Sequence, residues 1–184
     1  LKDSTGKNLL EHFYEDRKRW AYTFQNCAIL TRLRCIENAV VSNPGAKVFL
    51  TERSVLTDRF VFAEMLHDSG DIDELEWQLY LQWYDMFAKK IPMQGIIYIT
   101  TGSETSKKRI EIRHRSGEES IGTDYLEMLR RQHEKWLGNT ALPVLKVSTE
   151  DDISTEETIQ MIRQYINGLI MSQETGKEDE RKNE

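Results

Sequence analysis

Short apolar segments that alternate with longer helical segments constrain this chain more than any other feature. Three such segments have apolar centres, at residues 47–51, 95–100 and 143–147. Each is too short for a buried helix and has the length and the branched or aromatic side chains of a buried strand. Strands separated by helices form a parallel sheet that helices cover on both faces, so we expect an α/β fold of three layers.

The segments around these strands have helical periodicity. Apolar residues recur at helical spacing over residues 8–41, and the charged run around Asp16 predicts a joint between two helices, with Asp16 as a cap. A breaker at 42–45 ends the second helix. Further helices are predicted at 54–67, 73–90, 104–114, 119–138 and 154–171. Residues 172–184 are polar and predict a disordered tail, so the predicted domain is 1–171.

Composition and charge exclude some classes of protein. The chain has 184 residues, enough for one domain with its own core, and its formal net charge of −6 argues against a protein that coats nucleic acid. No apolar run approaches the roughly 20 residues that span a bilayer. Cys27 and Cys35 form no zinc motif with the histidines and indicate two thiols in a reducing compartment. We therefore expect neither a nucleic-acid partner nor a membrane partner.

The beginning of the sequence raises a separate expectation. Residue 1 is leucine and the first methionine is Met65, so we expect a fragment, a processed product or a partly recorded sequence. A targeting segment would then lie before residue 1. The expected compartment is cytoplasmic or mitochondrial.

A carboxylate and a guanidinium follow the first predicted strand. Ligands of parallel sheets bind at the carboxyl ends of the strands, where Glu52 and Arg53 would lie, with Asp58 a few residues later. An acid there can hold Mg²⁺, and an arginine can neutralise a phosphoryl group in transfer. The alternative is an ordinary helix N-terminus, where acidic side chains are favourable in any case.

A basic helix follows the second predicted strand. Arg109 and Arg113 are four residues apart and share a face, and Arg115 follows at the start of a glycine-containing segment. In an acidic protein this cluster is a candidate phosphate clamp, or lid. The alternative is a solvated helix face.

Polar side chains share one side of the first long helix. Gln25, Ala28 and Arg32 fall on the same side because residues three and seven apart share a face. A glutamine and an arginine there can read a planar, hydrogen-bonding base, with Phe24 and Tyr14 as walls. The alternative is that the two aromatic residues belong to the core and that Arg32 is a surface charge.

Taken together, these segments resemble the deoxynucleoside kinase family, which includes deoxycytidine kinase and deoxyguanosine kinase. The resemblance covers about residues 8–153. It rests on blocks that occur in order at near-constant spacing: Asn8-Leu9-Leu10-Glu11, Arg19-Trp20-Ala21-Tyr22-Thr23-Phe24-Gln25, Glu52-Arg53-Ser54, Asp58-Arg59-Phe60, Gly95-Ile96-Ile97-Tyr98, Arg109-Ile110, Tyr125-Leu126-Glu127 and His133-Glu134-Lys135-Trp136-Leu137.

The resemblance implies a fold and an activity. The fold is that of P-loop NTPases, with a three-layer parallel sheet. The activity is transfer of the γ-phosphoryl group of ATP, or of another nucleoside triphosphate, to the 5′-hydroxyl of a deoxynucleoside, with Mg²⁺. It also implies a homodimer.

On the acceptor side, the resemblance implies a pocket for the base. Gln25 matches the glutamine that hydrogen-bonds the base, and Phe24 and Phe62 match the aromatic residues that sandwich it. Arg32 and Asp58 match a charged pair at the inner edge of the pocket.

The resemblance also assigns groups to the sugar and the magnesium ion. Tyr14 and Glu118 match the groups that hold the sugar 3′-hydroxyl. Arg53 matches the arginine beside the 5′-hydroxyl, and Glu52 matches the acid of the magnesium network.

On the donor side, the resemblance implies a lid and a base contact. Arg109, Arg113 and Arg115 match the lid arginines that gather around the donor phosphates. Asp152 and Ile153 match the loop that touches the donor base, although the family often has an aromatic residue in place of Ile153.

The phosphate-cradling loop of this class has no match in the sequence. A P-loop needs Gly-x-x-x-x-Gly-Lys-Ser/Thr between a strand and a helix. We expect this loop and the family's general base to precede residue 1, and the central strand of the sheet to be missing with them. Residues 47–51 would then lack their inner neighbour, so we expect this fragment to be unstable and inactive alone.

The residues of the base pocket suggest a specificity. Ala28, Arg32 and Asp58 resemble the deoxycytidine and purine branch of the family, so we expect deoxycytidine, deoxyadenosine or deoxyguanosine to be preferred to thymidine. Two alternatives stay open. One is a thymidylate-type nucleoside monophosphate kinase, and the other is a non-catalytic product that binds nucleosides.

Overall fold

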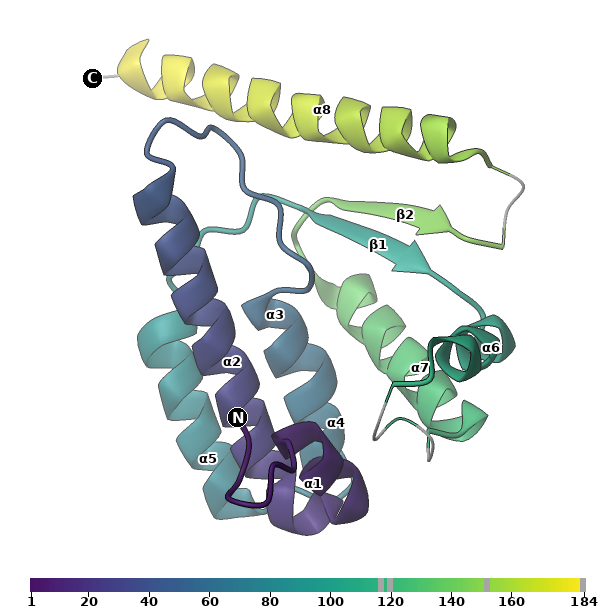
Figure 1. The fold of residues 1–184 in the computed structure, drawn as a ribbon. Helices are drawn as coiled ribbons and strands as arrows, with labels where there is room; N and C mark the ends of the chain where they lie inside the picture. The colour runs from purple at the N-terminus through teal and green to yellow at the C-terminus, as the bar shows by residue number, and fades with distance from the viewer. Residues whose placement is uncertain (116–117, 119–120, 151–152, 183–184) are drawn as a thin grey trace.

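A computed structural model gives the fold and describes residues 1–115, 118, 121–150 and 153–182 (Figure 1). The helices are α1 (Leu9–Glu15), α2 (Arg17–Ser42), α3 (Val55–Thr57), α4 (Glu64–Asp68), α5 (Glu74–Trp83), α6 (Ser103–Arg113), α7 (Thr123–Asn139) and α8 (Thr155–Lys182). Two π-helical segments are η1 (Asp58–Ala63) and η2 (Tyr84–Ala88), and the strands are β1 (Ile96–Thr100) and β2 (Val144–Ser148).

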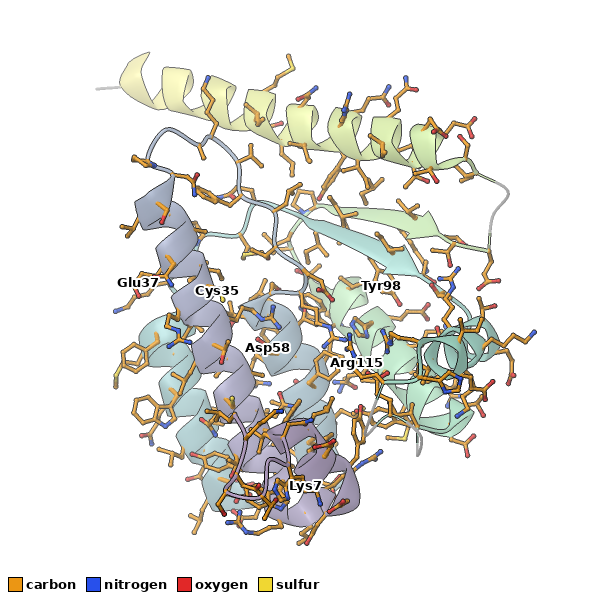
Figure 2. The ribbon with its side chains drawn as sticks, viewed as in Figure 1. Lys7, Cys35, Glu37, Asp58, Tyr98 and Arg115 are labelled. Atoms are coloured by element: carbon orange, nitrogen blue, oxygen red, sulfur yellow. The ribbon has the colours of Figure 1, made fainter. Side chains whose placement is uncertain are left out.

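The strands β1 and β2 form a parallel two-stranded sheet whose register pairs Ile96 with Val144. Figure 1 shows α8 on one side of the strands and α7 on the other. The Tyr165 hydroxyl of α8 donates to the Pro143 carbonyl at 2.6 Å and accepts from the Ile96 amide at 3.0 Å, which fixes α8 at the amino ends of both strands. On the other side, Tyr98 of β1 points toward α7 (Figure 2). The predicted α/β fold with a parallel sheet is confirmed.

The first predicted strand, at 47–51, is not a strand in the structure, and this prediction is wrong for the described residues. Val48, Phe49 and Leu50 are exposed, and no described strand pairs with them. A strand forms only where a neighbour completes its hydrogen bonds. The apolar composition predicted a buried segment, but composition does not show whether an adjacent strand is present to pair with it.

The joint between the first two helices lies at Asp16, as predicted. Asn8 and Glu11 form a capping box at the start of α1, with hydrogen bonds of 3.0 and 2.7 Å. The Asp16 side chain accepts from the Arg19 amide at 3.0 Å and starts α2. These caps satisfy amides that have no partner within their helices.

Two features of the helices differ from the predictions. The predicted helices at 54–67 and 73–90 each contain a π-helical segment, η1 and η2. Such segments often lie at functional sites, and hydrophobic periodicity does not reveal them. The last helix continues to Lys182, where the sequence predicted a disordered tail from residue 172. Polarity alone does not end a helix, because Glu, Gln and Lys are good helix formers.

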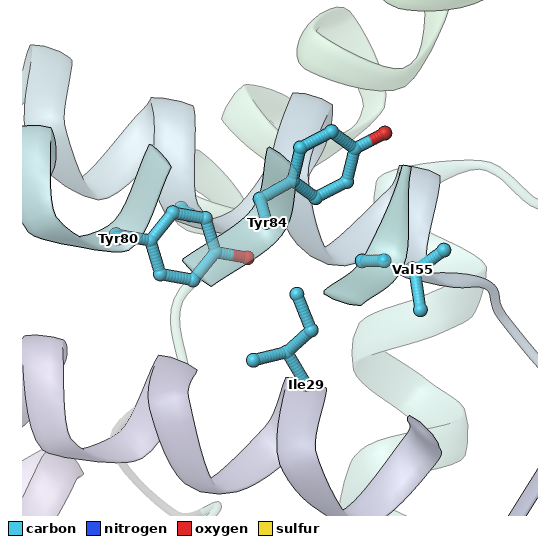
Figure 3. Packing of buried hydrophobic residues seen from close by; sticks show 6 residues of the cluster. Ile29, Val55, Tyr80 and Tyr84 are labelled. Carbon is cyan, nitrogen blue, oxygen red and sulfur yellow. The ribbon is translucent and has the colours of Figure 1, made fainter. Parts of the chain in front are cut away.

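Two apolar clusters hold the helices together. The first packs α2, α3, α5 and the π-helical segments through the buried Ile29, Val55, Ala63, Tyr80, Tyr84 and Ala88 (Figure 3). The second packs α1, α2 and α4 through Phe13, Ala21, Leu66 and Ile72. The long helix α2 contributes to both clusters, so its orientation is fixed along much of its length.

Candidate active site

An arginine–carboxylate pair joins α2 to η1. The Arg32 guanidinium bonds Asp58 twice, Nε to Oδ2 at 2.6 Å and Nη2 to Oδ1 at 3.2 Å. Its Nη1 donates to the Glu52 backbone carbonyl at 2.7 Å. The Asp58 side chain is only 3% exposed. Burial raises the pKa of Asp58, whereas the Arg32 guanidinium opposes that rise by favouring the carboxylate. The structure therefore brings Arg32, Asp58 and the Glu52 backbone together.

Gln25 lies two turns before Arg32 on α2 and is 2% exposed. Its side-chain amide forms no hydrogen bond with any residue that the structure describes. The amide is the part of this side chain that solvent still reaches. An amide that keeps this small opening and has no protein partner is well placed to bond a ligand.

Arg53 combines an unusual backbone with a position over an aromatic ring. Its φ of 57° lies in the left-handed region, which is costly for residues with a long side chain. Its guanidinium carbon is 4.7 Å from the centre of the Phe62 ring. The positive charge also lowers the pKa of Tyr14 and of Asp58 against the effect of their burial. Backbone strain of this kind clusters at functional sites.

Tyr14 and Glu118 approach each other from the end of α1 and the segment after α6. Burial raises the pKa of Tyr14, and the Glu118 carboxylate raises it further. Glu118 accepts from Arg113 Nη2 at 2.5 Å and pairs with Arg115 Nη1 at 3.5 Å. Two of the predicted lid arginines therefore contact the acid predicted to hold the sugar.

The third predicted lid arginine, Arg109, has different partners. Its Nη1 donates to the hydroxyls of Thr101 and Thr149, 3.4 Å from each, just beyond the ends of β1 and β2. This is the edge of the sheet at which α/β proteins bind ligands. Ile153 is exposed, and Asp152 lies outside the described residues.

A cavity of about 670 Å³ opens beside α2. The predicted site residues in its lining are Phe24, Ala28, Arg32 and Glu52. Phe24 also stacks on Phe13, with 4.7 Å between the ring centres. Phe62 is not among the residues that line this cavity. Its ring lies under the Arg53 guanidinium instead. The structure thus gathers Phe24, Ala28 and Arg32 of α2 around one cavity, but neither Gln25 nor Phe62 is among its lining residues.

Three residues beside the site had no predicted role. The Arg17 guanidinium lies 4.4 Å from the centre of the Tyr125 ring and 6.0 Å from that of Tyr14. Burial raises the pKa of Tyr125 to about 12. The His133 ring meets Phe62 edge-on at 6.2 Å. Tyr125 and His133 belong to segments that carry the family resemblance, which is the only sequence signal for them.

A magnesium site made by protein groups alone does not occur in the described residues, which contain no cluster of three or more acidic, histidine or cysteine side chains. Mg²⁺ in phosphoryl-transfer enzymes needs only one or two carboxylates, because substrate phosphates and waters complete its shell. The exposed Glu52 carboxylate, next to Arg53, fits that smaller requirement.

The comparison with known sequences decides the family. A family model described as deoxynucleoside kinase matches residues 2–171. The chain belongs to the deoxynucleoside kinase family. This kinase is 38% identical over 168 residues to a protein described as a probable deoxycytidine kinase of fowlpox virus, covering 87% of the chain and 70% of that protein.

Two further relatives extend the similarity to vertebrates. Human deoxycytidine kinase is 31% identical over 188 residues, with coverage of 92% of this kinase and 72% of the human protein. The mitochondrial deoxyguanosine kinase of Xenopus laevis is 32% identical over 185 residues, with coverage of 88% and 69%. The family thus identifies the protein as a phosphate-transferring enzyme, and the residues above are its candidate site.

Proposed function

We propose that the protein phosphorylates the 5′-hydroxyl of deoxycytidine or of a purine deoxynucleoside in preference to thymidine. The Arg32–Asp58 pair carries this proposal, because a guanidinium and a carboxylate together offer donors and acceptors to an exocyclic amine or carbonyl. Relatives named deoxycytidine and deoxyguanosine kinase support it. The test compares kcat/KM of the full-length protein for deoxycytidine, deoxyadenosine, deoxyguanosine and thymidine with ATP. Thymidine as the best acceptor would contradict the proposal.

The acceptor nucleoside would be held by groups on α1, α2, η1 and the segment after α6. Gln25 would hydrogen-bond the base, with Phe24, Ala28 and Phe62 around it. Tyr14 and Glu118 would hold the sugar 3′-hydroxyl. Arg113 and Arg115 form ion pairs with the Glu118 carboxylate in the structure. Binding of donor phosphates to these arginines would release that carboxylate, which could then bind the sugar.

The donor would be held by the cationic groups beyond the sheet. ATP, or another nucleoside triphosphate, supplies the γ-phosphoryl group when bound with Mg²⁺. Arg109, Arg113 and Arg115 would hold its phosphates, and the loop with Asp152 and Ile153 would touch its base. Glu52 would bind Mg²⁺, and Arg53 would neutralise charge near the 5′-hydroxyl. Catalysis of this kind consists mainly of positioning and charge neutralisation.

Two measurements separate this proposal from its alternatives. A thymidylate-type kinase would phosphorylate a nucleoside monophosphate faster than the matching nucleoside. A non-catalytic protein would bind deoxycytidine or deoxyadenosine in calorimetry and show no turnover. Faster phosphorylation of nucleosides than of nucleotides supports the proposal.

Replacing Gln25 with leucine is expected to lower kcat/KM for the preferred nucleoside by about a hundredfold, because hydrogen-bond readout of the base is lost. The same change should leave the melting temperature unchanged or raise it, since no hydrogen bond within the protein is lost and an apolar side chain replaces a largely buried polar one. Steady-state kinetics and calorimetric melting measure both effects.

Gln132→Leu is the matched control for that prediction. The Gln132 amide donates to the Phe60 carbonyl at 3.0 Å and to Glu64 at 3.3 Å. Its loss should lower the melting temperature and leave the KM for the nucleoside unchanged. A fall in stability with unaltered kinetics for Gln25→Leu would contradict the role of Gln25 as base reader.

We also propose a homodimer that forms through α5 and η2. Their outward face carries a stripe of exposed apolar residues: Leu75, Leu79, Trp83, Met86 and Phe87. The rings of Trp83 and Phe87 stack at 5.5 Å. An apolar stripe of this kind on a surface helix is typical of a helix-to-helix interface, and a second copy offers the same stripe.

Leu79→Lys is expected to convert the dimer to a monomer in analytical ultracentrifugation, because the lysine would place a charge in the middle of the apolar stripe. The exposed Ile112 of α6 supplies the control, since Ile112→Lys adds the same charge away from the stripe. An unchanged sedimentation coefficient for Leu79→Lys would rule out this face.

A further strand is proposed between residues 47–51 and β1 in the complete protein. The exposed Phe49 and Leu50 and the exposed Ile99 of β1 support it, since such apolar residues are normally covered in a parallel sheet.

For the compartment, we propose cytoplasm or mitochondrion, because one relative is named as mitochondrial. In the described part of the chain, no helix combines the length and apolarity needed to cross a bilayer.

A further inference from the structure

A column of three rings supports the Phe62 side of the site. The His133 ring of α7 stacks on Tyr98 of β1, with 5.7 Å between centres and 12° between planes. It meets Phe62 of η1 edge-on, at 6.2 Å and 89°. Phe62 in turn lies under the guanidinium of Arg53 at 4.7 Å. The column therefore connects the sheet and α7 to the arginine proposed to act on the acceptor hydroxyl.

The hydrogen bonds of His133 define its neutral form. Nδ1 lies 2.7 Å from the Leu129 carbonyl oxygen, which can only accept, so Nδ1 carries the hydrogen. Nε2 forms no hydrogen bond with any residue in the described part of the chain. A second hydrogen on Nε2 would therefore gain no hydrogen bond from the described residues, which favours the uncharged imidazole.

The charges around the column disfavour a second proton on His133. Arg53 faces it from the site, and Lys146 of β2 lies 5.8 Å from the centre of the Tyr98 ring. Glu134 of α7 pairs with Arg130 at 2.9 Å and with Lys146 at 3.5 Å, so its negative charge is already compensated. Burial, together with the charge of Arg53, lowers the pKa of His133 and outweighs the hydrogen bond to the Leu129 carbonyl, which raises it.

We propose that His133 is a positioning residue for the acceptor nucleoside, whose neutral ring sets the plane of Phe62 and thereby the place of the Arg53 guanidinium. The proposal rests on the proposed kinase function and adds to it a residue that does not touch substrate. Protonation would place a cation near Arg53, so the positioning is lost in acid.

Two substitutions of the full-length protein test this. His133→Asn removes the ring, and His133→Phe keeps a ring that cannot ionise. For His133→Asn we expect the KM for the nucleoside to rise about fivefold to tenfold, since one aromatic contact is lost. We expect kcat to fall as well, because the Arg53 guanidinium loses its support, and the KM for ATP to stay within about twofold of wild type. For wild type, the nucleoside KM should rise as the pH falls below about 6.5, the ordinary pKa of histidine, and this rise should vanish in His133→Phe.

His67→Asn is the control, because the His67 ring also stacks on an aromatic residue, Trp77, at 4.6 Å, but does not contact Phe62. It should leave the nucleoside KM unchanged. Equal effects of His133→Asn on all kinetic constants, an acid limb retained in His133→Phe, or failure of both variants to fold would overturn the proposal in favour of a purely structural role.

The calorimetric Kd for deoxycytidine gives a readout without turnover. The Kd should follow the nucleoside KM in His133→Asn, and a Kd equal to that of wild type would overturn the proposal. Absence of phosphorylation by the wild type would instead contradict the proposed function, and the binding measurement would still decide the role of His133.

Discussion

Replacing Arg53 with methionine is expected to lower kcat by about a thousandfold, the lower end of what an arginine contributes to phosphoryl transfer. Methionine keeps the apolar contact with Phe62 and loses the charge. It occupies the same left-handed backbone at a cost similar to that of arginine, so the substitution adds little strain. Single-turnover kinetics with saturating nucleoside and ATP measure the effect on the chemical step.

Arg59→Met provides the matched control. The Arg59 guanidinium also lies over aromatic rings, 4.3 Å from Trp77 and 5.0 Å from Phe60, and it pairs with Glu64 at 3.1 Å. It has no proposed contact with substrate, so kcat should stay within a few-fold of wild type. If Arg53→Met and Arg59→Met lose the same small factor, Arg53 has no special part in transfer.

Replacing Arg32 with methionine is expected to destabilise the fold by about 3 to 5 kcal/mol, because the Asp58 carboxylate stays buried without its partner. Urea unfolding monitored by fluorescence gives the change in free energy of unfolding. Removal of Arg32 also removes the larger of the two cationic effects, those of Arg32 and Arg53, that oppose the rise in the pKa of Asp58. In the variant, the folded state therefore binds a proton more readily than the unfolded state does.

That shift fixes the sign of the pH dependence. A carboxyl whose pKa is raised on folding contributes stability at low pH and loses it as pH rises through the folded pKa. The destabilisation of Arg32→Met should thus be smaller near pH 4 than near pH 7. A loss of stability that is equal at both values would show that the Asp58 charge is not its cause.

The double variant Arg32→Met/Asp58→Leu separates stability from specificity. With both charges removed, most of the lost stability should return, since apolar replacements of buried pairs are often neutral. Without the pair, the preference should move towards thymidine. Relative rates for thymidine that equal those of the wild type would contradict the proposed role of the pair.

Some features of the site could be predicted from the sequence alone. The spacing of Gln25, Ala28 and Arg32 predicted a shared face of α2, and helical periodicity is a local property that tertiary contacts seldom reverse. The cap at Asp16 was predicted for the same reason. The ion pair between Arg32 and Asp58 came only from the family resemblance, because its partners are 26 positions apart.

Other features depend on contacts that no local pattern encodes. The arginines of α6 share a predicted function, yet Arg109 bonds Thr101 and Thr149 whereas Arg113 bonds Glu118. The left-handed backbone of Arg53 had no sequence signal, since glycine or asparagine is usual there. The π-helical segment η1, which carries Asp58 and Phe62, interrupts a periodicity that predicted an ordinary helix.

The alternation of short apolar segments with helical segments determined the fold class and the two strands that pair. It did not determine the state of residues 47–51, whose apolar side chains are equally consistent with a paired strand and with an exposed extended segment. Hydrophobic patterning records which side chains gain from burial, and the chain itself carries that information. Hydrogen-bond partners, ring contacts and the charge around His133 depend on segments far apart in sequence, so only the tertiary structure decided them.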